Sequence, residues 1–146
     1  MIKSIFLTLT TVGAVQAGDH HYGPYPEVYV QECGSCHTPY PARALSQAGW
    51  NIQLSNLSKH FGTDASIDTT SLEQIRNYLM TNSSRKTKSA PLEETARISK
   101  TSWFLKEHGS NPPAGTSFSN CTACHTQADR GDFSEGSLKR PKVFGK

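Results

Sequence analysis

The sequence predicts an all-α protein. Apolar residues recur at intervals of three and four, as at Trp50, Leu54 and Leu57, which places them on one face of a helix. No long stretch alternates between apolar and polar residues, as a half-buried strand would. Hydrophobic residues make up only 35% of the 146-residue chain, so its side chains alone cannot form a large core.

The first 17 residues have the pattern of a secretory signal peptide. Lys3 precedes an apolar run that ends at the small residue Ala17. This run is well short of the ~20 apolar residues that a membrane-spanning helix needs, and a retained N-terminal anchor is the alternative interpretation. We therefore expect an exported protein that begins near Gly18 and has no membrane span.

The first expected helix follows an extended lead-in, residues 18–26, which is rich in Gly and Pro. Glu27 stands at the start of this helix, where a carboxylate interacts favourably with the helix dipole. The helix is expected to run to His37 and to end at the prolines of residues 38–41, since proline removes a backbone donor.

Two further helical regions complete the expected N-terminal domain, residues 18–82. One covers residues 42–60, with Phe61 at the end of its apolar stripe. The other is capped by Asp68 or Thr70, both of which are favourable N-cap residues.

Residues 83–91 are polar and basic, and they are expected to form a linker to a C-terminal domain, residues 92–146. One helix is expected from the start of that domain. A second, over residues 102–108, has Thr101 or Ser102 as its candidate N-cap. A last short helix is expected over residues 121–125.

A five-residue motif occurs twice, as CGSCH at residues 33–37 and as CTACH at residues 121–125. C-x-x-C-H is the attachment signature of c-type haem. Its two thiols add to the vinyl groups of one porphyrin, and the adjacent histidine lies under the ring, where it can ligate the iron. We therefore expect two covalently bound haem c groups, with His37 and His125 as iron ligands. The attachment residues are all four cysteines of the chain: Cys33, Cys36, Cys121 and Cys124.

Zinc, a disulfide or a redox dithiol are the alternative uses of these cysteines. Paired zinc-binding C-x-x-C motifs usually lie about 15–20 residues apart, whereas Cys36 and Cys121 are much further apart in this chain. A redox dithiol is typical of a β-α-β pattern, which is not visible here. Haem c also agrees with export, because this haem is attached outside the cytoplasm, and we expect the protein in the periplasm.

The ligand on the second face of each iron determines what such a site can do, because an open position permits gas or peroxide chemistry. Methionine is a poor candidate, since Met1 lies in the signal peptide and Met80 precedes the polar linker. We expect His60 and His108 instead, although either could be a surface histidine at the end of a helix. Two other histidines, with no assigned role, lie in the lead-in: His20 and His21.

Four blocks of the sequence resemble the small periplasmic dihaem cytochrome c family, in the order of that family. They are CGSCHTPYPARAL, WNIQLSNLSKHFGTDAS, RISKTSWFLKEH and CTACHTQADRGDF, and they cover most of residues 27–133. The resemblance implies bis-histidine ligation, His37 with His60 and His125 with His108. It also implies an N-terminal half similar to class I cytochrome c and a smaller, irregular helical C-terminal half. The partners it implies are an oxygen-binding monohaem cytochrome c and a membrane cytochrome b.

These features predict an electron carrier rather than an enzyme. Two imidazole ligands keep iron low-spin in both oxidation states, so little rearranges when an electron moves. A dihaem peroxidase-like enzyme or a gas-binding haem protein would need one displaceable axial ligand, and these remain the alternatives.

The charge of the chain gives little information about its partners. The formal net charge of +3 is offset by the haem propionates, and we expect no nucleic-acid partner in the periplasm. Basic residues cluster in the expected linker and in the tail, where they are either solvated or form a docking surface for an acidic redox partner. These residues are Arg85, Lys86 and Lys88, and Lys139, Arg140, Lys142 and Lys146.

Overall fold

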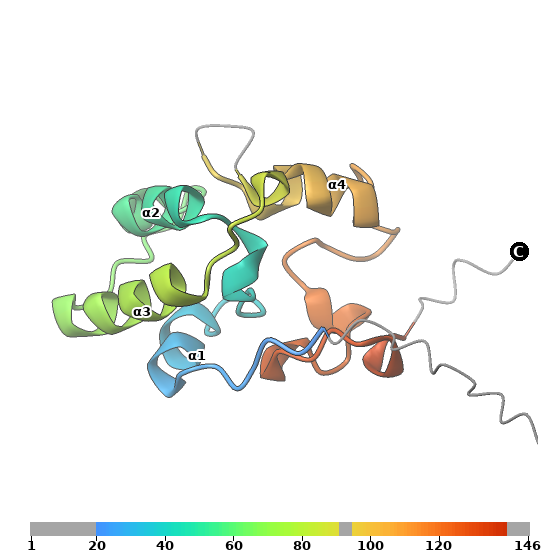
Figure 1. Ribbon diagram of the computed structural model, residues 1–146, viewed down its shortest axis with the longest axis horizontal. Helices are drawn as coiled ribbons and strands as arrows, with labels where there is room; N and C mark the ends of the chain where they lie inside the picture. Colours follow the sequence, from blue (N-terminus) through green and yellow to red (C-terminus); the bar gives the residue numbers. More distant parts are fainter. Residues whose placement is uncertain (1–19, 91–94, 140–146) are drawn as a thin grey trace, which may run out of the picture.

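The computed structural model describes residues 20–90 and 95–139, and all the regular elements of that part are helices, which confirms the predicted all-α class. The four α-helices of the described part are α1 (Glu27–Cys33), α2 (Gln47–Ser55), α3 (Thr69–Asn82) and α4 (Ser102–His108). Short 3-10 turns and isolated bridges account for its other regular structure. Helices α1, α2 and α3 pack on one side of the molecule, whereas α4 and the C-terminal segment form the other (Figure 1).

Three expectations fall on parts of the chain that are outside the described residues. They are the signal peptide at residues 1–17, most of the first helix expected from residue 92, and the end of the basic tail, residues 140–146. No described helix has both the length and the hydropathy needed to cross a membrane.

Helix α1 begins at Glu27 as predicted, but it ends at Cys33 rather than at His37. Its last backbone bond is donated by the Gly34 N–H to the carbonyl oxygen of Val30, at 2.9 Å. A Cβ atom at position 34 would collide with that same oxygen, so glycine permits the close turn that ends the helix. The expected end was wrong because this glycine stops the helix before the prolines do.

The region 42–60 is interrupted rather than continuous. Two 3-10 turns, Ala42–Ala44 and Leu57–Lys59, flank helix α2, which is capped by the side chain of Ser46. Trp50 and Leu54 are buried as the spacing predicts, but Phe61 is 43% exposed. Phe61 has a positive φ of 49° and lies well past the end of α2, so the helical spacing no longer determines where its side chain points.

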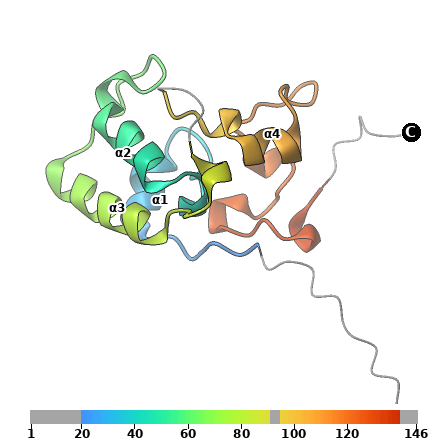
Figure 2. The same cartoon turned by 45° about the horizontal axis from the view of Figure 1, so that its top comes forward.

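Helix α3 is capped by Asp68, whose carboxylate accepts bonds from the N–H groups of Thr70 at 2.9 Å and Ser71 at 3.0 Å. Asp68 was one of the two predicted caps. Ile75 and Leu79 of this helix are fully buried, and α3 packs against both α1 and α2 (Figure 2). This three-helix packing supports the loops that carry the first motif.

The segment expected as a linker, residues 83–91, is attached to the N-terminal half through its backbone. The Ser84 N–H donates to Leu45 O, and the Ser46 N–H donates to Ser89 O, each at 2.9 Å. Ser89 is buried, and the 3-10 turn that ends there contacts α4. Polar backbone groups rather than apolar side chains thus place this segment between the two halves.

Helix α4 has the bounds that the sequence predicts. The side chain of Thr101 accepts a bond from the Phe104 N–H, and Gly109, with φ of 73°, ends the helix. The indole N–H of Trp103 donates to Ala44 O at 2.9 Å, which connects α4 to the N-terminal half. The second motif differs from expectation, because only Cys121–Ala123 form a 3-10 turn and no α-helix continues to residue 125.

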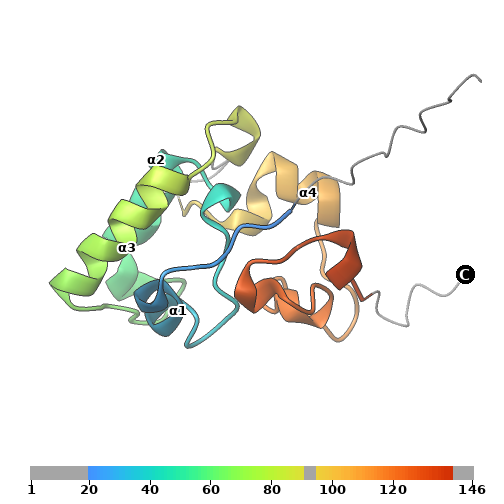
Figure 3. The same cartoon turned by 60° about the horizontal axis from the view of Figure 1, so that its bottom comes forward.

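The lead-in is extended and pairs with the C-terminal segment. The Tyr22 N–H donates to Gly131 O at 2.8 Å, and the Phe133 N–H donates to His20 O at 3.0 Å. Figure 3 shows this segment, in blue, passing from α1 towards the orange and red C-terminal residues. The two ends of the described chain therefore lie side by side.

Candidate haem-binding sites

The first motif histidine faces the first expected distal histidine. The ring centres of His37 and His60 are 6.3 Å apart, and their planes differ by 24°. Two metal–nitrogen bonds of about 2 Å each, with about 1 Å from each nitrogen to its ring centre, would separate two axial imidazoles by about 6 Å. The space between these rings therefore fits a single iron atom.

His37 is oriented by the backbone of the next residue, Thr38. Its Nδ1 lies 2.9 Å from the carbonyl oxygen of Thr38, and because a carbonyl only accepts, Nδ1 must carry the proton. Nε2 is then the nitrogen left to bind a metal. A hydrogen bond of this kind also strengthens the imidazole as a donor to the metal.

His60 lies in a tight loop after the 3-10 turn Leu57–Lys59. Its N–H donates to Leu57 O at 3.2 Å, and its carbonyl accepts from the Thr63 N–H at 3.0 Å. Burial, His37 and the cation of Arg97 together lower the pKa of His60, with burial the largest cause. The neutral form that these effects favour is the form that binds a metal.

The second pair is built from the C-terminal half. The ring centres of His108 and His125 are 6.2 Å apart, a separation that again fits one iron, but their planes differ by 64°. Phe104 stacks on His108 at 4.3 Å and 22°, and Phe133 lies 5.1 Å from His125. Each imidazole of this pair thus packs against an aromatic ring of the chain.

His125 differs from His37 in the partners of its ring. Its Nδ1 is buried and has no hydrogen-bond partner within the described residues. Burial, followed by His108 and His20, lowers the pKa of His125, so the neutral form is favoured here too.

The lead-in histidines are not members of the facing pairs and have side-chain contacts of their own. His20 is exposed, with its Nδ1 3.3 Å from the hydroxyl of Tyr22. The Nδ1 of His21 lies 3.6 Å from a carboxylate oxygen of Asp132. The side-chain contact of His20 stays within the lead-in, whereas that of His21 reaches the C-terminal segment.

The first cysteine of each motif is only partly exposed. Burial raises the pKa of Cys33 to about 12 and that of Cys121 to about 11. None of the four cysteines, all of which lie in the described part of the chain, is in a disulfide, and the described residues contain no group of three or more His, Cys, Asp or Glu side chains that could hold a metal ion by themselves.

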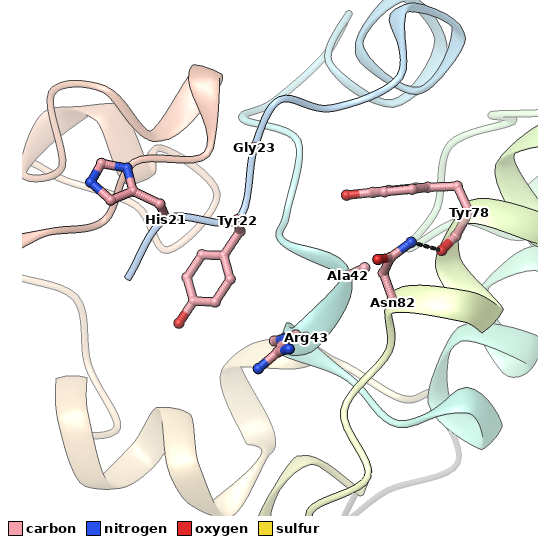
Figure 4. Close-up of a pocket in the computed structure, with 7 residues that line it drawn as sticks. All are labelled: His21, Tyr22, Gly23, Ala42, Arg43, Tyr78 and Asn82. Atoms are coloured by element: carbon pink, nitrogen blue, oxygen red, sulfur yellow. Dashed lines mark hydrogen bonds between the residues drawn. The ribbon is translucent and has the colours of Figure 1, made fainter. Parts of the chain in front are cut away.

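A separate pocket lies between the lead-in and the rest of the N-terminal half, with a volume of about 320 Å³. Figure 4 shows that Tyr22 projects from the lead-in on one side, whereas Tyr78 and Asn82 lie on the other, on α3. Burial raises the pKa of Tyr22, and the nearby Arg43 opposes this shift. None of the seven residues that line the pocket belongs to either motif or to the two facing pairs.

Sequence reasoning did not identify several side chains that shape these sites. Tyr40 lies 5.2 Å from the His37 ring, and the guanidinium of Arg97 lies 4.0 Å from the centre of the Phe61 ring, which in turn contacts His60. Tyr40 stands three positions after the first motif, but nothing in the local sequence indicates that its ring packs near His37. No local pattern marks Arg97, which reaches the first site from the other half of the chain.

Two C-x-x-C-H motifs, each with its histidine facing a second imidazole, define the class of c-type cytochromes that carry two haems. The family model for dihaem cytochrome c matches residues 29–133 of this chain. The chain belongs to the dihaem cytochrome c family, and it therefore binds two covalently attached haem c groups and is an electron-carrying c-type cytochrome.

Solved structures of dihaem cytochromes resemble the chain along most of its length. A diheme cytochrome c from Rhodobacter sphaeroides is 34% identical, with a TM-score of 0.63, over 74% of this chain and 96% of that one. A second structure, of DHC purified from the same organism, is 39% identical, with a TM-score of 0.61 and the same coverage. The diheme cytochrome from Shewanella baltica OS155 is 32% identical, with a TM-score of 0.64, over 80% of this chain and 93% of that one. Among curated proteins, no match was found.

Proposed function

We propose that this protein carries electrons in the periplasm through two bis-histidine haems, ligated by His37 with His60 and by His125 with His108. The observation that carries the proposal is the separation of the facing rings, 6.3 Å in one pair and 6.2 Å in the other. Both values match the spacing of two imidazoles on opposite faces of one iron. Cys33 with Cys36, and Cys121 with Cys124, would form the thioether attachments.

The role of the chain is to hold each imidazole in one position. When bound, haem supplies an iron centre that gains and loses one electron. The backbone of Thr38 fixes His37, and the stacked ring of Phe104 supports His108. Rigid ligands keep the rearrangement that accompanies electron transfer small, which favours a carrier.

A peroxidase-like or gas-binding protein is the alternative function, and it would need one ligand to leave its iron. The loop of His60 is the place to test this, because it belongs to a short turn rather than to an α-helix. Its two backbone bonds, to Leu57 and from Thr63, oppose such a displacement. These bonds therefore support the function of an electron carrier.

Two features support export to the periplasm and protein partners there. The N-terminal sequence predicts a signal peptide, and haem c is attached outside the cytoplasm. We propose redox proteins as partners, with the resemblance to the family favouring an oxygen-binding monohaem cytochrome c and a membrane cytochrome b.

Electron paramagnetic resonance of the oxidised protein tests the ligand assignment. We expect two low-spin ferric haems and no binding of carbon monoxide to the reduced wild type. His60→Ala should open only one haem to carbon monoxide, and His108→Ala only the other, because each removes one axial imidazole. His21→Ala, which changes an exposed histidine of the lead-in, is the matched control and should leave both haems closed.

Two results would contradict the proposal. One is a substantial high-spin signal in the wild type, or its rapid reaction with carbon monoxide, which would support the alternative function. The other is an unchanged spectrum in His60→Ala or in His108→Ala, which would show that the distal ligand is a different residue.

A further inference from the structure

Tyr40 lies between the two candidate haem sites. Its ring packs 5.2 Å from the ring of His37, with the planes at 49°. Its hydroxyl donates to the carbonyl oxygen of Phe118 at 3.1 Å, across 78 positions of sequence. One side chain thus touches the proximal ligand of the first site and the segment that leads into the second motif.

The Phe118 end of this contact continues to the second site in two ways. The same carbonyl oxygen lies 3.9 Å from the sulfur of Cys121, one of the attachment residues. The ring of Phe118 also lies edge-on to Phe104 at 4.9 Å, and Phe104 stacks on His108 at 4.3 Å. Phe118 therefore links Tyr40 to the attachment residue Cys121. Through the ring of Phe104 it also links Tyr40 to the axial ligand His108.

Tyr40 is fixed in this position by the N-terminal core. Its carbonyl oxygen accepts a 2.6 Å bond from the hydroxyl of Tyr29, a side chain that is only 2% exposed. A tyrosine hydroxyl is protonated at neutral pH, and it donates to the carbonyl oxygen of Phe118 because a carbonyl only accepts.

We propose that Tyr40 is the bridge through which electrons pass between the two haems. The inference rests on the proposed function, because it needs His37 as an iron ligand and Cys121 as an attachment residue. In each transfer one electron leaves the ferrous haem and reduces the ferric one. Tyr40 is neither oxidised nor reduced and keeps its proton. It lowers the tunnelling barrier because electronic coupling decays less steeply through bonded and hydrogen-bonded atoms than through empty space.

Two substitutions separate the parts played by the ring and by the hydroxyl. Tyr40→Phe keeps the ring against His37 and loses the bond to Phe118, whereas Tyr40→Leu loses both. Tyr78→Phe is the matched control, because Tyr78 is also half-buried and packs on Tyr29 but belongs to neither contact path. The rate of transfer between the haems is measured in the holo-protein by flash photolysis with nanosecond resolution, after photochemical injection of one electron.

We expect transfer to be severalfold slower in Tyr40→Phe, slower still in Tyr40→Leu, and unchanged in Tyr78→Phe. Low-spin ferric signals from both haems should persist in all three variants, because no axial ligand is changed. Transfer at the wild-type rate in both Tyr40 variants would overturn the bridge. Loss of the low-spin signals in the wild type itself would instead overturn the proposed ligation, so the two failures are distinguishable.

A second measurement tests the position of Tyr40 without following electron transfer. The protein is labelled with 3-fluorotyrosine, and the fluorine resonance missing from Tyr40→Phe is assigned to Tyr40. During stepwise reduction this signal should shift as each haem in turn loses its ferric paramagnetism, because Tyr40 contacts His37 of the first site and Phe118, which borders the second. A signal that follows the reduction of one haem only would overturn the bridging position.

Discussion

The angle between the two imidazole planes distinguishes the two histidine pairs. It is 24° between His37 and His60 and 64° between His108 and His125. Nearly parallel imidazoles both interact with the same one of two iron d orbitals that would otherwise be close in energy, so the two orbitals separate in energy. Crossed imidazoles act on both orbitals and leave them close in energy. The two ferric haems should therefore differ in electronic structure although their ligands are the same.

This difference predicts two distinct low-spin signals in the electron paramagnetic resonance spectrum. The His37–His60 haem should give a rhombic signal, and the His108–His125 haem a more anisotropic signal with a larger maximum g value. His108→Ala should remove the more anisotropic signal and leave the rhombic one. Two identical signals, or loss of the rhombic one in His108→Ala, would contradict the geometry described for these pairs.

The candidate ligands could be predicted from the sequence because two belong to short motifs and the chain contains few other histidines. His37 and His125 are part of the five-residue motifs, and only six histidines occur in the chain, so His60 and His108 had few competitors. Tyr40 and Arg97 could not be predicted from the sequence in this way. Their partners come from distant positions, as Phe118 does for Tyr40, and only the folded chain brings them together.

Among the helices, α4 is the element whose stability controls a candidate ligand most directly. It ends at His108, and its N-terminus is capped by Thr101, which is fully buried. The hydroxyl of Thr101 also donates to Ile98 O at 2.8 Å. Loss of this cap should fray the helix and loosen the ligand at its other end.

We predict that Thr101→Ala lowers the free energy of unfolding by about 1–2 kcal/mol. It should also let carbon monoxide react slowly with the reduced haem of His108, while the haem of His60 stays closed. Chemical denaturation and carbon monoxide kinetics measure the two effects. Thr101→Ser keeps the hydroxyl and is the matched control; if it is destabilised as much as Thr101→Ala, the cap is not the cause.

The helix boundaries show what the spacing of apolar residues leaves undetermined. The spacing correctly identified Trp50 and Leu54 as buried, but it continued the stripe to Phe61, beyond the actual end of α2 at Ser55. Periodicity describes which face a helix buries, and it does not say where the helix stops. Caps do so, and they were informative at Asp68 and Thr101.

At the scale of the whole molecule, the lead-in depends on a glycine. A Cβ atom on Gly23 would collide with the carbonyl oxygen of Arg130, because the two backbones approach closely where the lead-in pairs with the C-terminal segment. Gly131 on the other side of this contact has a φ of 80°, a conformation that glycine adopts readily. The pairing thus requires a small residue on one side and a flexible one on the other.

We therefore predict that Gly23→Ala destabilises the holo-protein by about 1–3 kcal/mol, the usual cost of overpacking a closed site. Thermal unfolding followed by circular dichroism measures the effect. Gly136→Ala is the control, because a Cβ atom there would meet only the Ser134 hydroxyl, at 3.8 Å. Equal unfolding midpoints for Gly23→Ala and the wild type would show that the lead-in contributes little to stability.

The all-α class was predictable from spacing, but the contact between the ends of the described chain was not. The lead-in contains no apolar periodicity, and its bonds to Gly131 and Phe133 are made by backbone groups. Any sequence can make such bonds if the chain brings it close enough. The sequence therefore predicts an extended segment without indicating what it pairs with.

This pairing also has a consequence for the order of folding. A backbone hydrogen bond joins Tyr22 and Gly131 across more than a hundred positions of sequence. Closing so long a loop costs conformational entropy, and this cost comes before the bond contributes any stability. Contacts of such high sequence separation slow folding. The lead-in should consequently dock in the last kinetic step, after both motifs have reached their places, and it should be the first segment to detach on unfolding.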